Sequence, residues 1–179
     1  MVRNFYELWR YRTLIWALVI RHLSMRYRGS ALGFLWSFLN PLFLMLIYTV
    51  VFKYYMRFDV DNYSIFLFCG LLPWIWVTSA IAEGTSAVVS SGHLITKSMF
   101  PAHVLPTVSV ITNMIHFLLA LPLLFIFILL AGMPIHSTLL GLPLVILLEF
   151  LLLEGCVLFC SALNSCLNFL KLLYSYLTI

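Results

Sequence analysis

The chain has 179 residues, of which 64% are hydrophobic and 9% are charged, and its formal net charge at pH 7 is +4. Soluble domains carry about 25% charged residues and disordered chains are polar and rich in charge, so this composition excludes both classes. The positive charge does not indicate nucleic-acid binding, because most of it precedes the first long apolar segment, at Arg3, Arg10, Arg12, Arg21, Arg26 and Arg28.

The first predicted element, residues 1–28, alternates between polar and apolar positions. Its large apolar residues recur near helical spacing, at Phe5, Leu8, Trp9, Trp16 and Val19 or Ile20. This pattern predicts an amphipathic helix that lies in the membrane interface, with tryptophan and arginine at the depth of the lipid headgroups. The segment contains six arginines and one acid, so we expect it on the cytoplasmic side.

Four apolar segments long enough to span a membrane follow. They lie at about 34–52, 64–89, 104–131 and 139–163. The second is broken by Gly70 and Pro73, and the third also contains prolines. The sequence therefore predicts an all-α polytopic membrane protein, with one transmembrane domain over residues 1–179.

The segments between the predicted spans give a consistent orientation. Four crossings place the polar segment 90–103 and the tail 164–179 inside with the N-terminus, and each of these two segments contains a lysine. The same crossings place 53–63 and 132–138 outside, and neither has a net charge. Because cytoplasmic loops carry the excess of basic residues, we expect a cytoplasmic N-terminus.

Motifs for common catalytic and nucleotide-binding sites are absent from the sequence. It contains no GxxxxGK[ST], HExxH or GxSxG, so we expect no catalytic or cofactor site in this chain. The cysteines lie in apolar surroundings without His or carboxylate at ligand spacing, and we interpret them as packing residues rather than metal ligands. They are Cys69, Cys156, Cys160 and Cys166. A glycan enzyme would need acidic clusters outside, where Asp59 and Asp61 are the only candidates.

Three glutamates, Glu83, Glu149 and Glu154, lie within or near the ends of predicted spans. An ionisable group at membrane depth is costly and is a functional candidate by default. Glu149 and Glu154 are about 140° apart around a helix, so they cannot form a paired carboxylate site. Each glutamate could face a partner helix or the headgroups, or serve a proton relay. His116, near Asn113, is interpreted as a hydrogen-bonding residue between helices.

Two further features allow a structural and a functional interpretation. The segment 90–103 has helix-compatible residues that end at Pro101, so it is either a short cytoplasmic helix that docks on a soluble partner or an ordinary loop. Trp36, Trp74 and Trp76 lie near span ends. They form either part of the interfacial aromatic belt or a lining for a sugar chain, whose C–H faces pack on aromatic rings.

Four blocks of the sequence resemble the permeases of the ABC-2 type polysaccharide-export family, which export O-antigen, capsule or teichoic-acid chains. The blocks are RYRGSALGFLWSFLNPLF (26–43), GLLPWIWVTSAIAEG (70–84), SGHLITKSMFPAHVLP (91–106) and SALN (161–164). The resemblance covers roughly residues 20–164, and the combination of blocks is specific where a single block would not be.

The resemblance implies a transport subunit of the bacterial inner membrane that has no ATPase of its own. In the family, two permease copies pair with two separate nucleotide-binding subunits, which hold ATP and Mg²⁺. An N-terminal helix lies on the cytoplasmic face, here about 3–22. A coupling helix contacts the ATPase, here about 91–101, with contacts expected from Lys97, Met99, Phe100 and Pro101.

The family's cargo is a polysaccharide linked to a polyprenyl diphosphate lipid. The resemblance places three arginines at the depth of this diphosphate, namely Arg21, Arg26 and Arg28. Guanidinium groups suit phosphate geometry, although the same residues could serve only to anchor the topology. Trp36, Trp74 and Trp76 would then line the substrate path. The alternatives are a proton-coupled or passive transporter that uses Glu83, Glu149 or Glu154, and a non-functional truncated permease.

The sequence departs from the family pattern at two places. The coupling segment has Ala102-His103 where members often have a basic-acidic pair, so a specific salt bridge to the ATPase is not expected. After SALN the family continues with a charged loop and two further spans, for six in all, whereas this chain reads SCLNFLKLLYSYLTI. We expect a truncated or frame-shifted product that does not export by itself.

Overall fold

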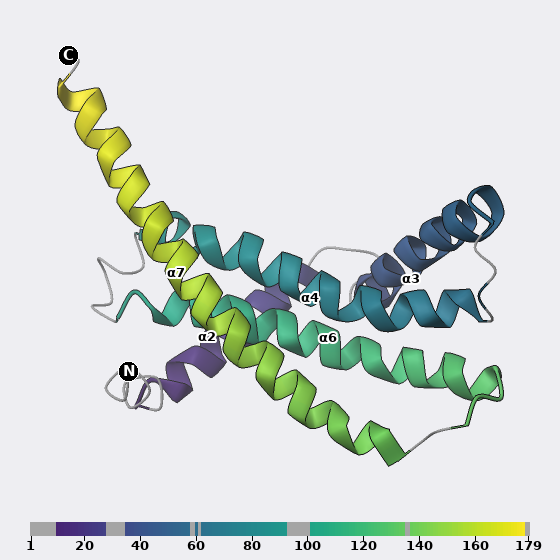
Figure 1. Ribbon diagram of the computed structural model, residues 1–179. Helices are drawn as coiled ribbons and strands as arrows, with labels where there is room; N and C mark the ends of the chain where they lie inside the picture. The colour runs from purple at the N-terminus through teal and green to yellow at the C-terminus, as the bar shows by residue number, and fades with distance from the viewer. Residues whose placement is uncertain are drawn as a thin grey trace.

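The computed structural model describes residues 10–27, 35–57, 60, 62–92, 101–134 and 137–177. Within these ranges the regular structure is entirely helical, and no strand is present (Figure 1). Four helical segments are long and apolar enough to cross a membrane, namely Trp36–Lys53, Tyr63–Ser90, Val104–Leu130 and Leu139–Lys171. The prediction of an all-α, multi-pass membrane protein is confirmed.

Helix α2 (Arg12–Tyr27) packs against the first turns of α6 (Val104–Leu130). Its buried stripe is Ile15, Leu18 and Val19, which contacts Val104, Leu105 and Val108 of α6 and Ala87 of α4. Trp16 and Ile20 lie on another side of the helix and are exposed. Of the predicted stripe, Val19 packs in the protein whereas Trp16 and Ile20 do not, because apolar residues occupy two sides of α2.

Helix α3 (Trp36–Thr49) continues into a π-helical turn, η2 (Val50–Tyr55), before the chain turns back into α4 (Tyr63–Ser90). The turn contains two residues with positive φ, Arg57 at 54° and Asn62 at 52°. Asn62 directly precedes α4, and asparagine is among the residues that enter this region most readily. The chain therefore reverses direction within a few residues.

Helix α4 runs without interruption through Gly70 and Pro73, so the predicted break in the second span is wrong. Proline inside a membrane helix removes one backbone hydrogen bond, but neighbouring helices and local adjustments compensate. Helices α3 and α6 also contain prolines within their bounds, at Pro41 and Pro122. The predicted third span (104–131) corresponds closely to α6, which begins at Val104 because Pro106 is tolerated in a first turn.

The last helix, α7, is preceded by a short 3₁₀ turn, η3 (Ser137–Gly141), and extends over Leu142–Leu177. At 1.5 Å per residue, its 36 residues measure about 54 Å, well beyond the ~30 Å of a hydrocarbon core. The predicted fourth span ended at 163, yet the helix continues through the following residues because these are helix-compatible. In Figure 1 its C-terminal part reaches beyond the other helices.

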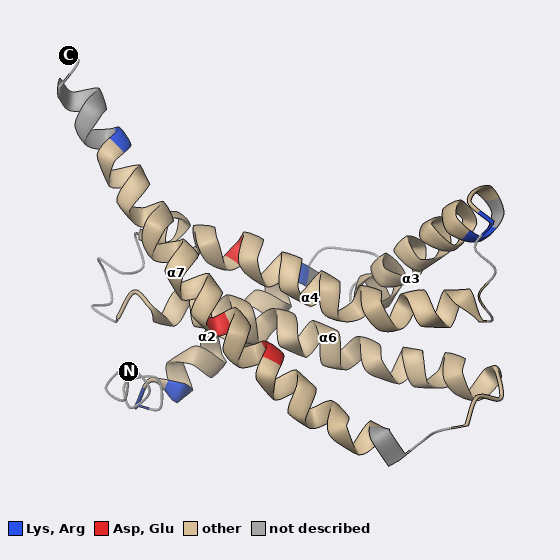
Figure 2. Cartoon of the chain, viewed as in Figure 1, with Lys and Arg blue, Asp and Glu red and all other residues tan. Residues whose placement is uncertain are grey.

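The core lies where α4 packs antiparallel to α6 and α7 crosses both (Figure 1). Its buried residues are Phe68, Leu71, Leu72, Trp76 and Ala80 from α4, Val110, Phe117, Ala120, Leu121 and Leu124 from α6, and Leu153 and Val157 from α7. Gly84 allows a close approach of α4 to α7, since a Cβ atom there would overlap the Val157 side chain. Figure 2 shows few charged residues along these helices, with acidic ones on α4 and α7.

Candidate functional site

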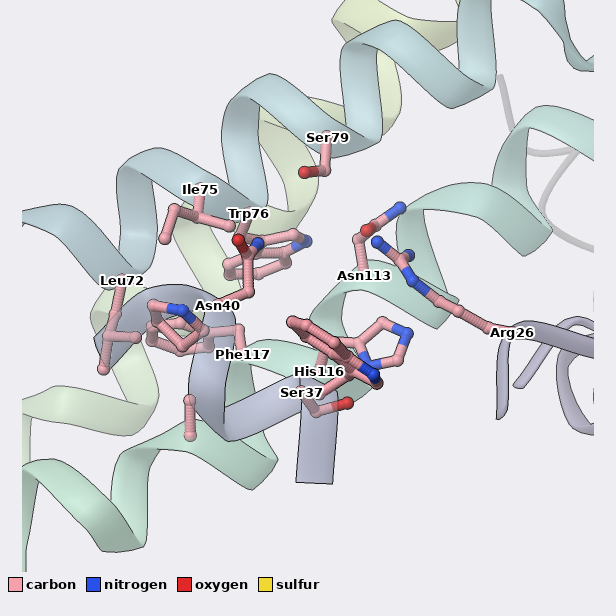
Figure 3. Close-up of a pocket in the computed structure, with 13 residues that line it drawn as sticks. Arg26, Ser37, Asn40, Leu72, Ile75, Trp76, Ser79, Asn113, His116 and Phe117 are labelled. Carbon is pink, nitrogen blue, oxygen red and sulfur yellow. The ribbon is translucent and has the colours of Figure 1, made fainter. Parts of the chain in front are cut away.

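A cavity of about 260 Å³ lies between the last turn of α2, the first turns of α3 and the middle of α4 and α6 (Figure 3). Helix α2 contributes only Arg26, whereas α3, α4 and α6 each contribute both polar and apolar side chains. The cavity is lined by Arg26, Trp36, Ser37, Asn40, Pro41, Leu72, Ile75, Trp76, Ser79, Asn113, His116, Phe117 and Ala120. A concave site of this kind, mostly apolar with a few polar groups that converge, is typical of small-molecule binding.

Two of the three predicted tryptophans meet at this cavity. Trp76 is buried, stacks on Phe117 with ring centroids 5.2 Å apart, and donates from Nε1 to the carbonyl of Val110 at 3.4 Å. Trp36 lines the cavity and is 48% exposed. Trp74 is 63% exposed and does not line it. Residues two apart on a helix point about 160° away from each other, so Trp74 and Trp76 cannot face the same cavity.

The polar part of the lining has hydrogen-bonding capacity that could serve a ligand. In Figure 3 the side chains of Ser37, Asn40, Ser79 and Asn113 lie around the same space as the aromatic rings. Asn40 and Ser79 make no side-chain hydrogen bond to another described residue. An amide and a hydroxyl within a membrane-spanning region are stabilised by hydrogen bonding, so a polar ligand or water suits this space.

A charged network closes one end of the cavity. Arg26 Nη1, in the last turn of α2, donates to Glu83 Oε1 of α4 at 3.2 Å. Asn113 Nδ2 of α6 donates to the other carboxylate oxygen, Glu83 Oε2, at 2.8 Å and to the Ser109 carbonyl at 3.0 Å. The three side chains join α2, α4 and α6. Of the glutamates singled out in the sequence, Glu83 is therefore the one paired with an arginine.

A second cavity, of about 380 Å³, lies on the other side of this network, toward the end of α4. Hydroxyl groups are frequent in its lining, which comprises His22, Met25, Arg26, Glu83, Ser86, Ala87, Ser90, Ser91, Leu105, Ser109 and Thr112. Arg26 lines both cavities, Glu83 lines only the second and Asn113 lines only the first. The Arg26–Glu83–Asn113 network therefore forms the partition between them.

The other two glutamates lie on α7, away from both cavities. Glu154 lies within hydrogen-bonding distance of Thr107 Oγ1 on α6, and its Oε2 atom is buried without a partner among the described residues. Glu149 is partly buried. Asn164 donates from Nδ2 to the Thr85 carbonyl of α4 at 2.9 Å. These contacts join α7 to α6 and α4.

Several of the predicted site residues do not take part in this site. Arg21 is exposed on α2 and lines neither cavity. Pro101 lies three residues before the start of α6, and its carbonyl accepts from the Val104 amide at 3.1 Å. The other predicted contacts lie outside the described residues, namely Arg28, Lys97, Met99 and Phe100. Within the described part of the chain, no group of three His, Cys, Asp or Glu residues could hold a metal ion.

Sequence reasoning did not identify Asn113, Asn40 and Ser79 as site residues, although a signal was present. Polar residues are rare in the apolar segments, and those on α4 recur at helical spacing as Ser79, Glu83, Ser86 and Ser90. This stripe follows the lining of both cavities. Asn113 carries a similar signal as an amide in the middle of an apolar segment.

Comparison with known proteins confirms the resemblance predicted from the sequence. The chain is 49% identical over 126 residues to the O-antigen export system permease protein RfbA of Myxococcus xanthus, a match that covers 70% of this chain and 48% of that protein. It is 34% identical over 152 residues to two proteins of the same name from Klebsiella pneumoniae, covering 84% of this chain and 59% of each. No protein-family model matches. The chain thus spans about half the length of the curated relatives it matches.

Proposed function

We propose that this chain is the membrane-spanning permease subunit of an ABC exporter that moves a lipid-linked polysaccharide across the bacterial inner membrane. The observation that carries the proposal is the 49% identity to an O-antigen export permease over 126 residues. O-antigen is accordingly the first candidate substrate, ahead of capsule or teichoic-acid chains. Four apolar helices of membrane-spanning length support a transport role.

The energy for transport would come from a separate ATPase subunit, as the resemblance to the permease family implies, and these 179 residues contain no phosphate-binding GxxxxGK[ST] loop. Two permease copies would pair, and the segment 91–101 would dock on the ATPase from the cytoplasm. The positive N-terminal segment supports a cytoplasmic N-terminus with α2 at the inner membrane surface. Cysteines introduced at Lys97, Met99 and Phe100 should crosslink to a co-expressed ATPase subunit. Failure of all three would refute the docking assignment.

The first cavity would form part of the path for the cargo. Trp36, which is half exposed, offers an aromatic face to the C–H faces of a sugar, and Asn40 and Ser79 offer hydrogen bonds to hydroxyl groups, while the buried Trp76 shapes the wall behind them. Arg26 lies at the boundary of the cavity, where a guanidinium group can bind a diphosphate through several charge-assisted hydrogen bonds. Arg21 and Arg28 would contribute to the same charged region. The lipid diphosphate would thus approach from the α2 end.

A chimera tests the proposed function directly. Residues 20–164 of this chain replace the corresponding part of the Myxococcus xanthus permease, which supplies the remaining length, and the chimera is expressed in a strain that lacks its own permease. We expect O-antigen to return to the cell surface, and we expect this to require an intact ATPase subunit. Export that persists without the ATPase and is abolished when the proton gradient is dissipated would favour the proton-coupled alternative instead.

A further inference from the structure

We propose that Glu83 is an internal competitor for the anionic headgroup that binds Arg26, so that the cargo's diphosphate must displace the Glu83 carboxylate to bind. This inference rests on the proposed function, because it takes a polyprenyl diphosphate as the ligand of Arg26. It adds a regulatory element that the function itself does not require. The contact between Arg26 and Glu83 then holds the site closed in the absence of cargo.

The ion pair is suited to displacement because it is incomplete. A single contact joins the two groups, from Arg26 Nη1 to Glu83 Oε1 at 3.2 Å, although a guanidinium can bind a carboxylate through two parallel hydrogen bonds. The side chains are 48% and 42% exposed, respectively, so a ligand can reach both groups. Partly exposed ion pairs contribute little to stability. A diphosphate carries more charge and more acceptor oxygens than one carboxylate, and it can therefore replace Glu83 at Arg26.

Glu83 retains a hydrogen-bond donor, Asn113, when the Arg26 side chain turns away from it. Asn113 donates to Glu83 Oε2 at 2.8 Å, and Asn113 itself is buried and held by the Ser109 carbonyl. An unpartnered carboxylate in a membrane-spanning helix would be costly. Because the Asn113 contact does not depend on Arg26, the carboxylate retains a hydrogen bond throughout the exchange. Arg26 is thus the replaceable member of the network.

Displacement would also change the connection between the two cavities. Arg26 lines both of them, and the network forms their partition. When Arg26 turns from Glu83 toward a diphosphate, the contact between α2 and α4 is lost at this point. The polar stripe of α4, with Ser79 on one side and Ser86 on the other, then becomes continuous along the path. Binding of the headgroup would in this way open the route to the aromatic cavity.

Equilibrium binding to the full chain tests the proposal. The protein is reconstituted in phosphatidylcholine nanodiscs, and binding of radiolabelled farnesyl diphosphate is measured at low ionic strength. Farnesol and inorganic diphosphate serve as competitors that separate the lipid tail from the charged headgroup. We expect Glu83→Gln to bind the probe roughly two- to fivefold more tightly, because this variant removes the competing charge and keeps an acceptor for Asn113. Glu83→Asp, whose carboxylate lies farther from Arg26, should change affinity in the same direction.

Three further variants decide the outcome. Arg26→Gln should weaken binding about tenfold, and adding Glu83→Gln to it should have no further effect, because the competition acts through Arg26. Glu149→Gln, which replaces a carboxyl group on α7 outside both cavities, should bind like the wild type. If Arg26→Gln weakens binding but Glu83→Gln does not tighten it, the competitor role is wrong and the headgroup site stands. If Arg26→Gln has no effect on binding, both the headgroup site and the competitor role of Glu83 are wrong. If Glu149→Gln tightens binding as much as Glu83→Gln does, the competitor role alone is wrong.

Discussion

Helices α4 and α7 approach so closely at Gly84 that this position should accept no larger residue. A Cβ atom on Gly84 would overlap the Cγ1 atom of Val157, which is fully buried. Gly70, in the same helix, has no neighbouring atom within 4 Å of such a Cβ. The two alanine variants, Gly84→Ala and Gly70→Ala, therefore introduce the same methyl group into the same helix in opposite surroundings.

The expected difference in the free energy of unfolding between Gly84→Ala and Gly70→Ala follows from two opposing effects. Replacing glycine by alanine inside a helix stabilises it by about 1 kcal/mol, and this gain applies to both variants. Overpacking of a close contact costs about 1–3 kcal/mol, and this cost applies only to Gly84→Ala. We therefore expect Gly84→Ala to be less stable than Gly70→Ala by about 1–3 kcal/mol, which corresponds to a thermal midpoint lower by roughly 2–12 °C for a chain of this size.

Thermal unfolding of the detergent-solubilised protein, followed by tryptophan fluorescence, measures this difference. The double variant Gly84→Ala/Val157→Ala removes the methyl group that causes the overlap, so it should be less destabilised than the sum of its two single changes. Equal midpoints for Gly84→Ala and Gly70→Ala would refute the close approach of α4 and α7. Strict additivity in the double variant would refute Val157 as the residue responsible.

The remaining predictions concern contacts within and between the helices, and each compares two matched variants by thermal unfolding. Trp76→Ala should lower the free energy of unfolding by about 3–5 kcal/mol, because the Trp76 ring is buried and stacked. Trp74→Ala, on the exposed side of α4, should lower it by less than about 1 kcal/mol. Similar losses for the two variants would contradict the placement of the two rings. Thr107→Val should lower the free energy of unfolding by about 1–3 kcal/mol, because it leaves Glu154 without its hydroxyl partner. Thr78→Val removes a hydroxyl that bonds only its own helix, so this variant should be nearly as stable as the wild type. Unchanged stability in Thr107→Val would show that the contact to Glu154 adds no stability.

The positions of the helices could be predicted from the sequence because apolar segments of sufficient length must form helices in lipid. Their ends were harder to predict. Helix α7 continues beyond residue 163. The thickness of the membrane sets the length of the segment inside the lipid, but the helix can extend past the membrane surface. The break expected at Pro73 is absent because packing and the surrounding hydrogen bonds override the local effect of proline.

The candidate site could be predicted only in part, since its contacts join residues distant in the sequence. Glu83 could be singled out as an acid in an apolar segment, yet its partner Arg26 lies 57 residues away and meets it only because α2 packs on α6 and reaches α4 near Ala87. The separation of Trp74 from Trp76 could have been predicted from helical spacing alone. Asn113 could not have been assigned to Glu83 without the pairing of α4 with α6.

The contact between Gly84 and Val157 also divides each helix into two arms of different length. About 30 Å of α7 lies between Val157 and its C-terminal end at Leu177, and about 32 Å of α4 lies between Gly84 and its first residue, Tyr63. If the two helices rotate about this point by about 10°, each of these ends moves by roughly 5 Å, while the residues at the crossing barely move. A small rotation at the crossing would therefore produce a large displacement at the distant ends, without bending either helix.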